Sequence, residues 1–559
     1  MYRQKNLYDT NTLPASPPPA APPLDQRYLT ARSADGTHND LNNPTMGAAF
    51  TRFGRNVPLD ATIPDMKRLL DPNPRLVSHK LFTRNTFRPA TIVNLMAASW
   101  LQFMVHDWLS HGRNEKDGPF LVDVQDAEWS GERPMPILRT GVDPTRPGYS
   151  EDMPPSYLNN ATHWWDGSQI YGNDEATVQS LRSHVDGKMQ VLPSGLLPVD
   201  PEHGVDLTGV SGNYWIGLSM LHTLFTREHN AICDRLKRDY PDWSDDQLFD
   251  KARLINAALL AKIHTTEWTT AILPNPTAVA ALRGNWWGIQ GETLVNAFGR
   301  LSHIDLVSGI PGSETAQHAA PYSITEEFVS VYRMHPLIPD NLSFRSHTDD
   351  AAIEDRTFRD VSFHKSREVA ERISMPDLFY SFGTMYPGAV TLHNFPRFMQ
   401  ELEDDKGNII DLAATDLMRV RERGVPRYNE FRELLHLPRV KTFEELTDNP
   451  TWAQEIREVY DNDIDKVDLT VGLFAEPLPP GFGFSDTAFR IFVLMASRRL
   501  KSDRFFTVDC TPAVYTQVGM DWIADNTMLT VLQRHHPELG PRMRGLDNAF
   551  KPWPRVGQP

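Results

Sequence analysis

Cysteine is almost absent from this sequence, which has only Cys233 and Cys510 among its 559 residues. Two thiols cannot build a disulfide framework, so the chain does not resemble small secreted proteins held together by disulfides, and a reducing compartment suits it. No apolar run approaches the ~20 residues that cross a membrane, and the start, MYRQKNLYDTNTLP, lacks the apolar segment of a secretory signal. We expect a cytoplasmic protein, and peripheral contact with a membrane stays open.

Positive charge is also scarce relative to negative charge. The chain has 56 Lys and Arg against 72 Asp and Glu, which gives a formal net charge of −16. This balance argues against nucleic acid as a partner and against a polybasic membrane anchor. With 40% hydrophobic and 23% charged residues, the chain has the composition of a soluble globular protein that buries a large core.

Proline is concentrated near the N-terminus, where residues 13–24 read LPASPPPAAPPL. A tract of this kind cannot form a helix. We therefore divide the chain into a proline-rich N-terminal arm at residues 1–60 and one large body at residues 61–559. The arm is either a disordered tail or a strap laid over the body.

The segment 326–335, EEFVSVYRMH, has the spacing i, i+3, i+4, i+7 of one helical face at Phe328, Val331, Tyr332 and His335. Ser323 and Glu326 would form a capping box, and Pro336 would end the helix near His335. An imidazole is a common axial ligand of haem iron, and a phenol one turn before it could be oxidised to a radical. The same spacing also fits an amphipathic helix with a packed histidine and tyrosine.

A second helix is expected over residues 91–110, TIVNLMAASWLQFMVHDWLS. Gln102 and His106 lie one turn apart on an otherwise apolar helix. A buried amide and a buried imidazole each need a partner. They are therefore either a satisfied buried pair or a polar pair over the open face of a metal centre. Asp107 points about 100° away and needs a different role.

The loop at residues 162–168, THWWDGS, offers closely spaced oxygen atoms from Thr162, Asp166, Ser168 and the carbonyl of Trp164. Hard oxygen ligands of this kind suit Ca²⁺. Asp107 is a candidate fifth ligand, which would tie its helix to this loop. The alternative is a glycine-containing turn with solvated polar groups.

Another long helix begins with a capping box of Ser244 and Gln247 and ends before Pro274. Near its end, His264 and Thr269 lie five residues apart, about 140° around an α-helix. They would converge only on a group that lies across the end of the helix. The alternative is a helix terminus with polar surface residues.

The segment 489–506, FRIFVLMASRRLKSDRFF, passes from an apolar run into Arg498 and Arg499. A buried arginine can bind a carboxylate through two parallel hydrogen bonds. The arginine-rich segment DLAATDLMRVRERGVPRYNEF contains Asp416, which could accept a hydrogen bond from the far nitrogen of His335. Structural ion pairs are the default interpretation of its arginines.

Six motifs in this order, LQFMVHDW, THWWDGSQIYG, HTLFTREHN, AKIHTTEWT, EEFVSVYRMH and ASRRLKSDRFF, resemble the peroxidase–cyclooxygenase superfamily. Within it the chain is most similar to the fatty-acid alpha-dioxygenases. The likeness runs from about Phe87 to the C-terminus and leaves out the proline-rich arm. It implies a mainly α fold, with a large helical catalytic domain at residues 61–559, few short strands and a non-covalently bound haem b.

The resemblance also implies roles around the haem. His335 matches the proximal ligand of the iron. His106 matches the distal histidine, and Gln102 matches its companion. Tyr332 matches the tyrosine that carries the catalytic radical.

The resemblance further implies an anion site and a metal site. His264, Thr269 and Arg499 match the three residues that hold the fatty-acid carboxylate. The calcium ligands are matched by Asp107, Thr162, Trp164, Asp166 and Ser168.

Three departures from the mammalian-type peroxidases bear on the activity. Val105 stands before His106 where those enzymes have an acid that esterifies the haem, and a valine cannot form an ester. Ser211 aligns with the distal catalytic arginine and Tyr214 with the second esterifying acid. These departures favour a dioxygenase over a peroxidase.

The reaction that the resemblance implies is oxygenation of a free fatty acid at C2. The tyrosyl radical removes a C2 hydrogen, O₂ adds, and a 2-hydroperoxy fatty acid results, with hydrogen peroxide as the activator of a monomeric enzyme. The alternative enzyme is a haem peroxidase that oxidises small molecules with hydrogen peroxide. The non-enzymatic alternative is a helical interaction protein whose arm serves as an SH3-type ligand.

Overall fold

The computed structural model describes residues 5–16, 22–114, 117–127, 129–403 and 407–557. Helices make up 45% of the structure and strands 8%, so the predicted mainly α fold is confirmed. The strands form antiparallel pairs: β1 (Thr51–Arg52) with β6 (Leu158–Asn159), β2 (Arg113–Asn114) with β5 (Arg139–Thr140), β3 (Phe120–Val122) with β4 (Met135–Ile137), β7 (Asn341–Arg345) with β8 (Ala352–Thr357), and β9 (Leu402–Glu403) with β10 (Ile409–Ile410). The core is therefore built by helices.

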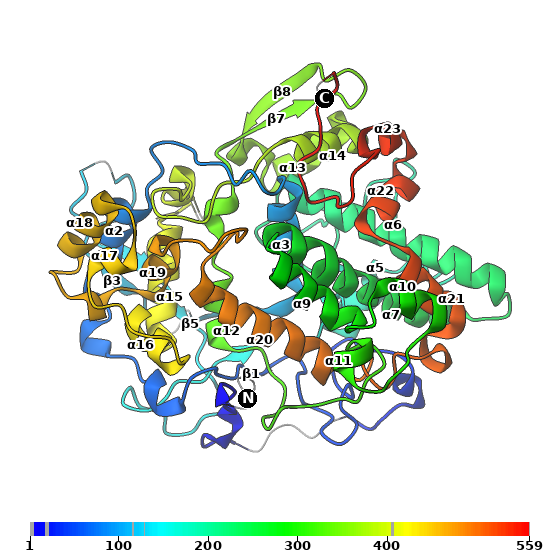
Figure 1. Cartoon of the computed structure of the whole chain (residues 1–559), viewed down its shortest axis with the longest axis horizontal. Coiled ribbons are helices and arrows are strands. Elements are labelled where there is room, and N and C mark those ends of the chain that lie inside the picture. The colour runs from blue at the N-terminus through cyan, green and yellow to red at the C-terminus, as the bar shows by residue number, and fades with distance from the viewer. Residues whose placement is uncertain (1–4, 17–21, 115–116, 128, 404–406, 558–559) are drawn as a thin grey trace.

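Three helices pack together at the centre: α3 (Met96–Trp108), α6 (Ile216–Asp239) and α7 (Asp245–Ile263). A fourth, α20 (Asp486–Ser502), packs on α12 (Glu326–Val331) below α3 in Figure 1. Ten of the 13 residues of α3 are buried, which is the pattern of a core helix rather than a surface one. The predicted capping box of Ser244 and Gln247 at the start of α7 is confirmed.

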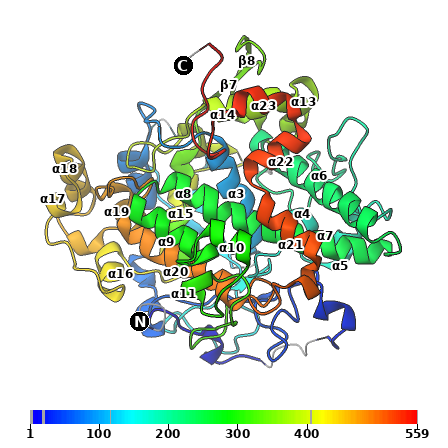
Figure 2. The same ribbon diagram turned by 45° about the vertical axis from the view of Figure 1, so that its right-hand side comes forward.

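The other helices cover this centre (Figure 2). Those of seven residues or more are α5 (Glu175–Leu181), α9 (Pro276–Trp287), α10 (Glu292–Phe298), α13 (His364–Arg372), α14 (Met375–Thr384), α15 (Leu412–Glu422), α16 (Tyr428–Leu434), α18 (Pro450–Val459), α19 (Leu469–Ala475), α21 (Pro512–Asp525) and α22 (Met528–His535). Among the described residues, no helix combines the length and apolarity that crossing a bilayer requires.

The helix predicted up to His335 is shorter than expected. α12 ends at Val331, Tyr332 caps it, and His335 opens a separate 3₁₀ turn. A helix continued through Pro336 would lose one hydrogen bond and press the proline ring against the carbonyl of Tyr332. The predicted capping box is also wrong, because the hydroxyl of Thr325, and not of Ser323, accepts the capping hydrogen bond.

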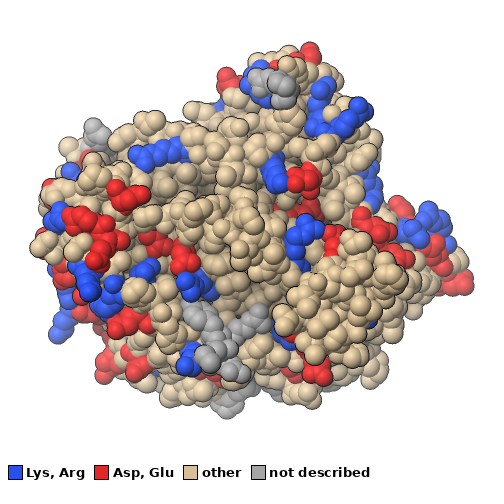
Figure 3. Space-filling view, viewed as in Figure 1, with Lys and Arg blue, Asp and Glu red and all other residues tan. Residues whose placement is uncertain are grey.

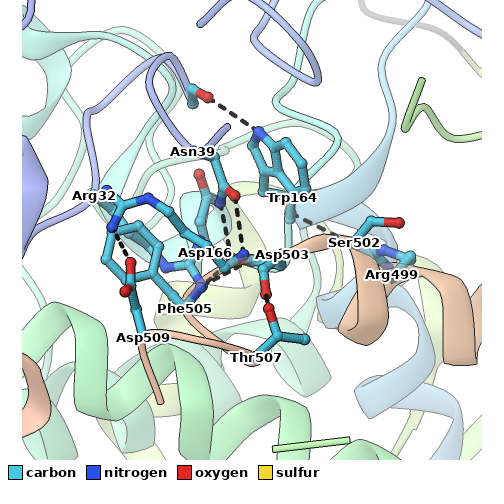
Figure 4. A network of polar contacts seen from close by, with 12 residues as sticks. Arg32, Asn39, Trp164, Asp166, Arg499, Ser502, Asp503, Phe505, Thr507 and Asp509 are labelled. Carbon is cyan, nitrogen blue, oxygen red and sulfur yellow. Dashed lines mark hydrogen bonds and ion pairs between the residues drawn. The ribbon is translucent and has the colours of Figure 1, made fainter. Parts of the chain in front are cut away.

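The described part of the N-terminal arm lies against the body as a strap. Arg32 pairs with Asp503 at 2.9 Å, and the Asn39 amide donates to the same carboxylate at 2.9 Å. Arg504 donates to the backbone carbonyl of Leu29 at 2.9 Å. These contacts fix the chain just after α20 (Figure 4). Part of the proline tract, residues 17–21, lies outside the described residues.

Candidate active site

Trp108, the last residue of α3, is the common contact of three predicted site residues. Its ring meets the rings of Tyr332 and His264 edge-on, at centroid distances of 5.2 and 5.3 Å. The guanidinium carbon of Arg499 lies 4.2 Å from the Trp108 ring centroid. The structure therefore brings the predicted radical tyrosine together with two of the predicted carboxylate ligands. Sequence reasoning missed Trp108 itself, although it closes the LQFMVHDW motif.

Arg499 is a buried cation whose charge acts on the carboxylate of Asp107 without forming an ion pair with it. Its side chain is 1% exposed, and its one hydrogen bond is a long one of 3.4 Å from Nη2 to the Trp164 carbonyl. Nε and Nη1 are buried and have no partner, and no carboxylate in the described part of the chain forms an ion pair with it. The rings of Trp108 and Trp165, the latter at 4.8 Å, offset part of the desolvation cost. A buried charge left in this state points to an anionic ligand.

The neighbouring arginine is held differently. The guanidinium of Arg498 donates to the carbonyl oxygens of Ala320 and Pro321 at 2.7 and 2.8 Å. It is as buried as Arg499, but its Nη2 is occupied by the backbone. The hydrogen bonds therefore indicate that Arg498 has a structural role, whereas Arg499 is free to bind a ligand.

His264 presents one defined hydrogen-bond donor. The indole N–H of Trp100 donates to Nδ1 of His264 at 3.1 Å, so Nδ1 carries no proton. Burial, and then the charge of Arg499, hold the pKa of His264 well below its ordinary value. The imidazole is therefore neutral, and its proton must be on Nε2.

The chain at His264 is a π-helical turn. α7 passes into η6 (His264–Trp268), and the backbone N–H of Thr269 donates to the carbonyl of His264 across five residues. The expected separation of about 140° is thus wrong, because it assumed α-helical geometry; one wide turn brings the two residues onto one face. The Thr269 hydroxyl donates to the same carbonyl at 2.7 Å. The hydroxyl proton of Thr269 is thus already engaged in a hydrogen bond within the turn.

The Tyr332 hydroxyl is buried and has no hydrogen-bond partner within the described part of the chain. Its ring packs against Phe328 and Phe492 at centroid distances of 4.6 and 5.5 Å, in addition to Trp108. Burial raises the pKa of Tyr332 well above its ordinary value. The side chain is therefore a protonated phenol in an apolar setting, with no neighbour competing for its O–H.

His335 and Asp416 come together as predicted from the sequence. Nδ1 of His335 lies 2.8 Å from a carboxylate oxygen of Asp416, and Arg333 lies 3.1 Å from the other oxygen. Burial alone would raise the pKa of Asp416, but Arg333 and His335 bring it below its ordinary value. An ionised Asp416 favours a proton on Nδ1 and leaves a lone pair on Nε2. The side chain of His335 is 26% exposed, so this donor set fits a haem iron.

His106 and Gln102 lie on α3 but do not bond to each other. Nδ1 of His106 is buried without a hydrogen-bond partner among the described residues, and burial lowers the pKa of His106 to about 4. Gln102 accepts from the indole N–H of Trp215 at 2.8 Å and donates to the carbonyl of Asn213 at 3.0 Å. The amide is therefore fixed by other groups, while Nδ1 of a neutral imidazole remains without a partner in the described chain.

The predicted calcium ligands cluster as oxygen atoms around two buried carboxylates. Asp107 accepts from the backbone N–H and hydroxyl of Ser168 at 2.6 and 2.8 Å, and Asp166 accepts from the Thr162 hydroxyl at 3.0 Å. The other oxygen of Asp107 is buried without a partner. Burial, and then the charge of Asp166, raise the pKa of Asp107 well above its ordinary value. A bound cation would relieve both effects.

The metal at this place would need neutral ligands as well. The described residues contain no group of three or more His, Cys, Asp and Glu side chains that could hold a metal ion. Two carboxylates with hydroxyl and carbonyl oxygens form an oxygen-only set of the type that Ca²⁺ accepts. The Trp164 carbonyl, predicted as one ligand, also receives the long hydrogen bond from Arg499.

The helical fold and this cluster define the class of protein. The chain belongs to the animal haem peroxidase family, whose model matches residues 31–545, and the family implies a haem cofactor. A likeness to peroxidase A from Dictyostelium discoideum, with a TM-score of 0.72 and 20% identity, shows the fold alone.

Within this family the chain belongs with the alpha-dioxygenases. It is 39% identical to alpha-dioxygenase PIOX of Oryza sativa subsp. japonica over 547 residues, which cover 95% of this chain and 87% of that protein. It is 39% identical to alpha-dioxygenase 2 of Arabidopsis thaliana, with 93% and 84% of the two chains covered. The crystal structure of the Oryza sativa fatty acid alpha-dioxygenase matches with a TM-score of 0.91 and 36% identity, over 99% of this chain and 91% of that one.

The likeness reaches further toward the N-terminus than the motifs indicated. The family model begins at residue 31, and the Oryza sativa structure covers nearly the whole chain. Much of the arm is therefore part of the shared fold. Arg32 and Asn39, which bind Asp503, lie in this added stretch.

Proposed function

We propose that this protein oxygenates a free fatty acid at C2 and releases a 2-hydroperoxy fatty acid. The observation that carries the proposal is the buried, unpaired guanidinium of Arg499 beside the unpartnered hydroxyl of Tyr332, with the Trp108 ring in contact with both. A variant of the Oryza sativa enzyme with phenylalanine in place of a tyrosine has been crystallised with palmitic acid, which supports a fatty acid as the substrate.

Arg499 and His264 hold the carboxylate in this proposal. Arg499 offers two nitrogen donors without a partner among the described residues, Nε and Nη1, and a full positive charge, and His264 adds a neutral N–H donor at Nε2. Thr269 contributes only if its hydroxyl leaves the carbonyl of His264. A carboxylate fixed here places C2 next to the tyrosine, and orientation of this kind can lower a barrier by several kcal/mol, up to roughly 7–11 kcal/mol in the best-aligned cases.

The residues present fit a haem b: His335 would hold its iron through Nε2, and Val105 could form no ester with it. Asp416 would fix the tautomer of His335, while His106 and Gln102 would serve the distal side. When bound and activated by hydrogen peroxide, the haem would supply the oxidising power that removes one electron and one proton from the Tyr332 phenol.

The chemistry on the substrate then belongs to Tyr332. Its oxygen radical removes one hydrogen atom from C2, which restores the phenol and leaves a carbon radical. O₂ adds to that carbon, and the resulting peroxyl group takes the hydrogen atom back from Tyr332. The product is the 2-hydroperoxide, which can lose CO₂ and water, with cleavage of its O–O bond, to give an aldehyde one carbon shorter. The apolar packing around the phenol protects its radical from water.

A calcium ion completes the proposed site as a structural element. Asp107, from the end of α3, and Asp166, from the loop before α4 (Ser168–Tyr171), would bind it together. The ion would thereby fix Trp108, the residue that follows Asp107, in its place beside the substrate. We expect the enzyme to act as a monomer in the cytoplasm.

The test is oxygen consumption by purified, haem-loaded protein supplied with palmitic acid, followed by mass analysis of the product. We expect O₂ uptake and a product heavier than the acid by one O₂. Tyr332→Phe should keep the Soret absorbance and lose the uptake. Rapid oxidation of guaiacol with hydrogen peroxide, without any O₂ uptake on palmitic acid, would instead establish the peroxidase and refute the proposal.

A further inference from the structure

Large apolar side chains are unusually exposed in one short segment between α9 and the end of α11 (Asp305–Ser308). Five of them are between 61% and 77% exposed, and the sixth is 46% exposed: Ile289, Phe298, Leu301, Ile304 and Leu306, then Leu294. In the rest of the described chain only Phe50 and Val185 reach the same exposure. Figure 3 shows a broad area without charged residues over α10 and α11, at the lower right. We call this surface the 289–306 face.

The charged residues of this region are paired with one another, with α20 or with the backbone. Arg283 pairs with Glu292, and Asp305 pairs with Lys501 of α20 at 3.2 Å. Arg300 donates to backbone carbonyls at the end of α11, at 3.1 and 2.9 Å. Each Lys and Arg of the segment thus has an acidic or backbone partner, and His303 is its one exposed histidine, in a chain whose net charge is −16. A negatively charged lipid surface would repel the acidic protein, and the face has no free Lys or Arg to bind that surface.

The face lies one helix away from the candidate active site. α9 packs on η6, the turn that begins with His264, and α11 packs on α9. Figure 2 shows α8 to α11 as one cluster at the front of the molecule. The outer side of this cluster is the 289–306 face. The inner side of the same cluster packs on the turn that begins with His264, the proposed hydrogen-bond donor to the substrate carboxylate.

We propose that the 289–306 face docks on the surface of an uncharged, zwitterionic phospholipid layer. Large contiguous apolar patches on soluble proteins mark interaction surfaces, and short helices of this kind lie in the plane of a lipid interface with their apolar side buried. This inference rests on the proposed function, because a long-chain fatty acid resides mainly in lipid layers and an enzyme docked there meets its substrate directly. Because Arg283 and Arg300 are already engaged and a lone histidine is mostly neutral at pH 7, the face favours zwitterionic over anionic headgroups.

The experiment is sedimentation of the haem-loaded, full-length protein with phosphatidylcholine vesicles. The face variant carries Phe298→Ser and Leu306→Ser. The matched control carries Phe50→Ser and Val185→Ser, which remove side chains of similar size and exposure elsewhere on the surface. The wild type and the control should sediment with the vesicles. The face variant should partition at least roughly tenfold more weakly, because each large apolar side chain buried in lipid is worth about that factor.

Activity assays separate this inference from the proposed function. With a fatty acid dissolved as monomers, the face variant should turn over like the wild type; with the acid embedded in vesicles, its rate should fall. Equal sedimentation of the face variant, stronger wild-type binding to anionic vesicles, or wild-type protein that stays in solution would each overturn the inference. So would a wild-type dimer that the face variant dissociates, since the occupant would then be a second copy. Absence of O₂ uptake by the wild type would refute the proposed function. The sedimentation assay would still test whether the 289–306 face binds lipid.

Discussion

Replacing Arg499 by glutamine removes the positive charge and keeps a side chain of polar character. We expect KM for a fatty acid to rise strongly and kcat to change less, because carboxylate binding is shared by the ground state and the transition state. Losing one partner of a buried, hydrogen-bonded charge pair costs about 2–5 kcal/mol, which corresponds to roughly a thirtyfold to several-thousandfold loss of affinity. The free Nε and Nη1 of the guanidinium place Arg499 in this range rather than in that of exposed pairs.

Arg498→Gln is the matched control for this experiment. It lies on the same turn of α20, it is equally buried, and its guanidinium is held by the carbonyls of Ala320 and Pro321. Loss of the Arg498 guanidinium should lower the free energy of unfolding, since two carbonyl oxygens lose their hydrogen-bond donors. Each lost hydrogen bond costs about 1 kcal/mol or more. KM should remain close to that of the wild type. Oxygen uptake as a function of fatty-acid concentration measures both constants for each variant.

Arg499→Met should stabilise the substrate-free enzyme, whereas Arg498→Gln should destabilise it. An unpaired buried charge destabilises the folded state, and an apolar side chain of similar length removes this cost. We expect a higher Tm for Arg499→Met than for the wild type in the absence of substrate. A fatty acid should raise the Tm of the wild type and leave that of the variant unchanged.

Two results would refute carboxylate binding by Arg499. One is an unchanged KM in Arg499→Gln. The other is a wild-type enzyme that oxygenates a long-chain fatty alcohol as well as the matching acid, since an alcohol has no charge for the guanidinium to bind. An equal rise of KM in Arg498→Gln would show that the weaker substrate binding arises from a disturbed fold of α20.

Three further predictions test the other parts of the site, and a fourth concerns His229, a buried residue of α6 outside the site whose ring nitrogens lie 2.9 Å from the Tyr171 hydroxyl and the Gly187 carbonyl. Tyr332→Phe should bind haem normally, by its Soret band, and show no O₂ uptake. Asp416→Asn should weaken haem retention roughly 10–100-fold in a titration, because the orienting carboxylate behind His335 is lost. Asp166→Ala, or a chelator added to the wild type, should lower the Tm, with calcium content measured by elemental analysis. Acidification should destabilise the protein through His229, whose pKa burial lowers to about 4.

The sign for His229 follows from the two states. The unfolded chain binds a proton below pH ~6.5 and the folded one only near 4, so stability is full above 6.5 and is lost as the pH falls toward 4, by up to roughly 3 kcal/mol. His229→Gln should flatten this slope in chemical denaturation. Residual O₂ uptake in Tyr332→Phe, unaltered haem retention in Asp416→Asn, and unchanged calcium content in Asp166→Ala would each remove the role concerned.

Local signals in the sequence located several elements well. The capping box of Ser244 and Gln247 starts α7 as predicted, because both hydrogen bonds form within four residues and need no tertiary partner. The helix before His335 was predicted too long, since the spacing of apolar residues continues past the point where Pro336 stops the backbone. Periodicity records which side chains face the core, and the backbone hydrogen bonds decide where a helix ends.

The site was only partly accessible to sequence reasoning. Arg498 and Arg499 have the same chemistry and the same burial, and tertiary contacts alone show which one the backbone already binds. The π-helical turn at His264 has no sequence signature in its spacing. Motif order predicted that Tyr332, His264 and Arg499 share one site, and the structure places all three against Trp108. The protonation of His264, however, depends on Trp100, which lies 164 positions away.

A buried unpaired arginine requires a scaffold that holds it against its own desolvation cost, and three segments do so here. The Trp164 carbonyl of the candidate calcium loop contacts Arg499 directly, and Trp108 at the end of α3 covers its face. Four residues further on, Asp503 is bound by Arg32 and Asn39 of the arm, which fixes the end of α20 (Figure 4). Stability gained in the arm and the loop therefore offsets the desolvation cost of Arg499. The stretch around Arg32 and Asn39 thus belongs to the scaffold of the candidate site, which agrees with a family match that begins at residue 31.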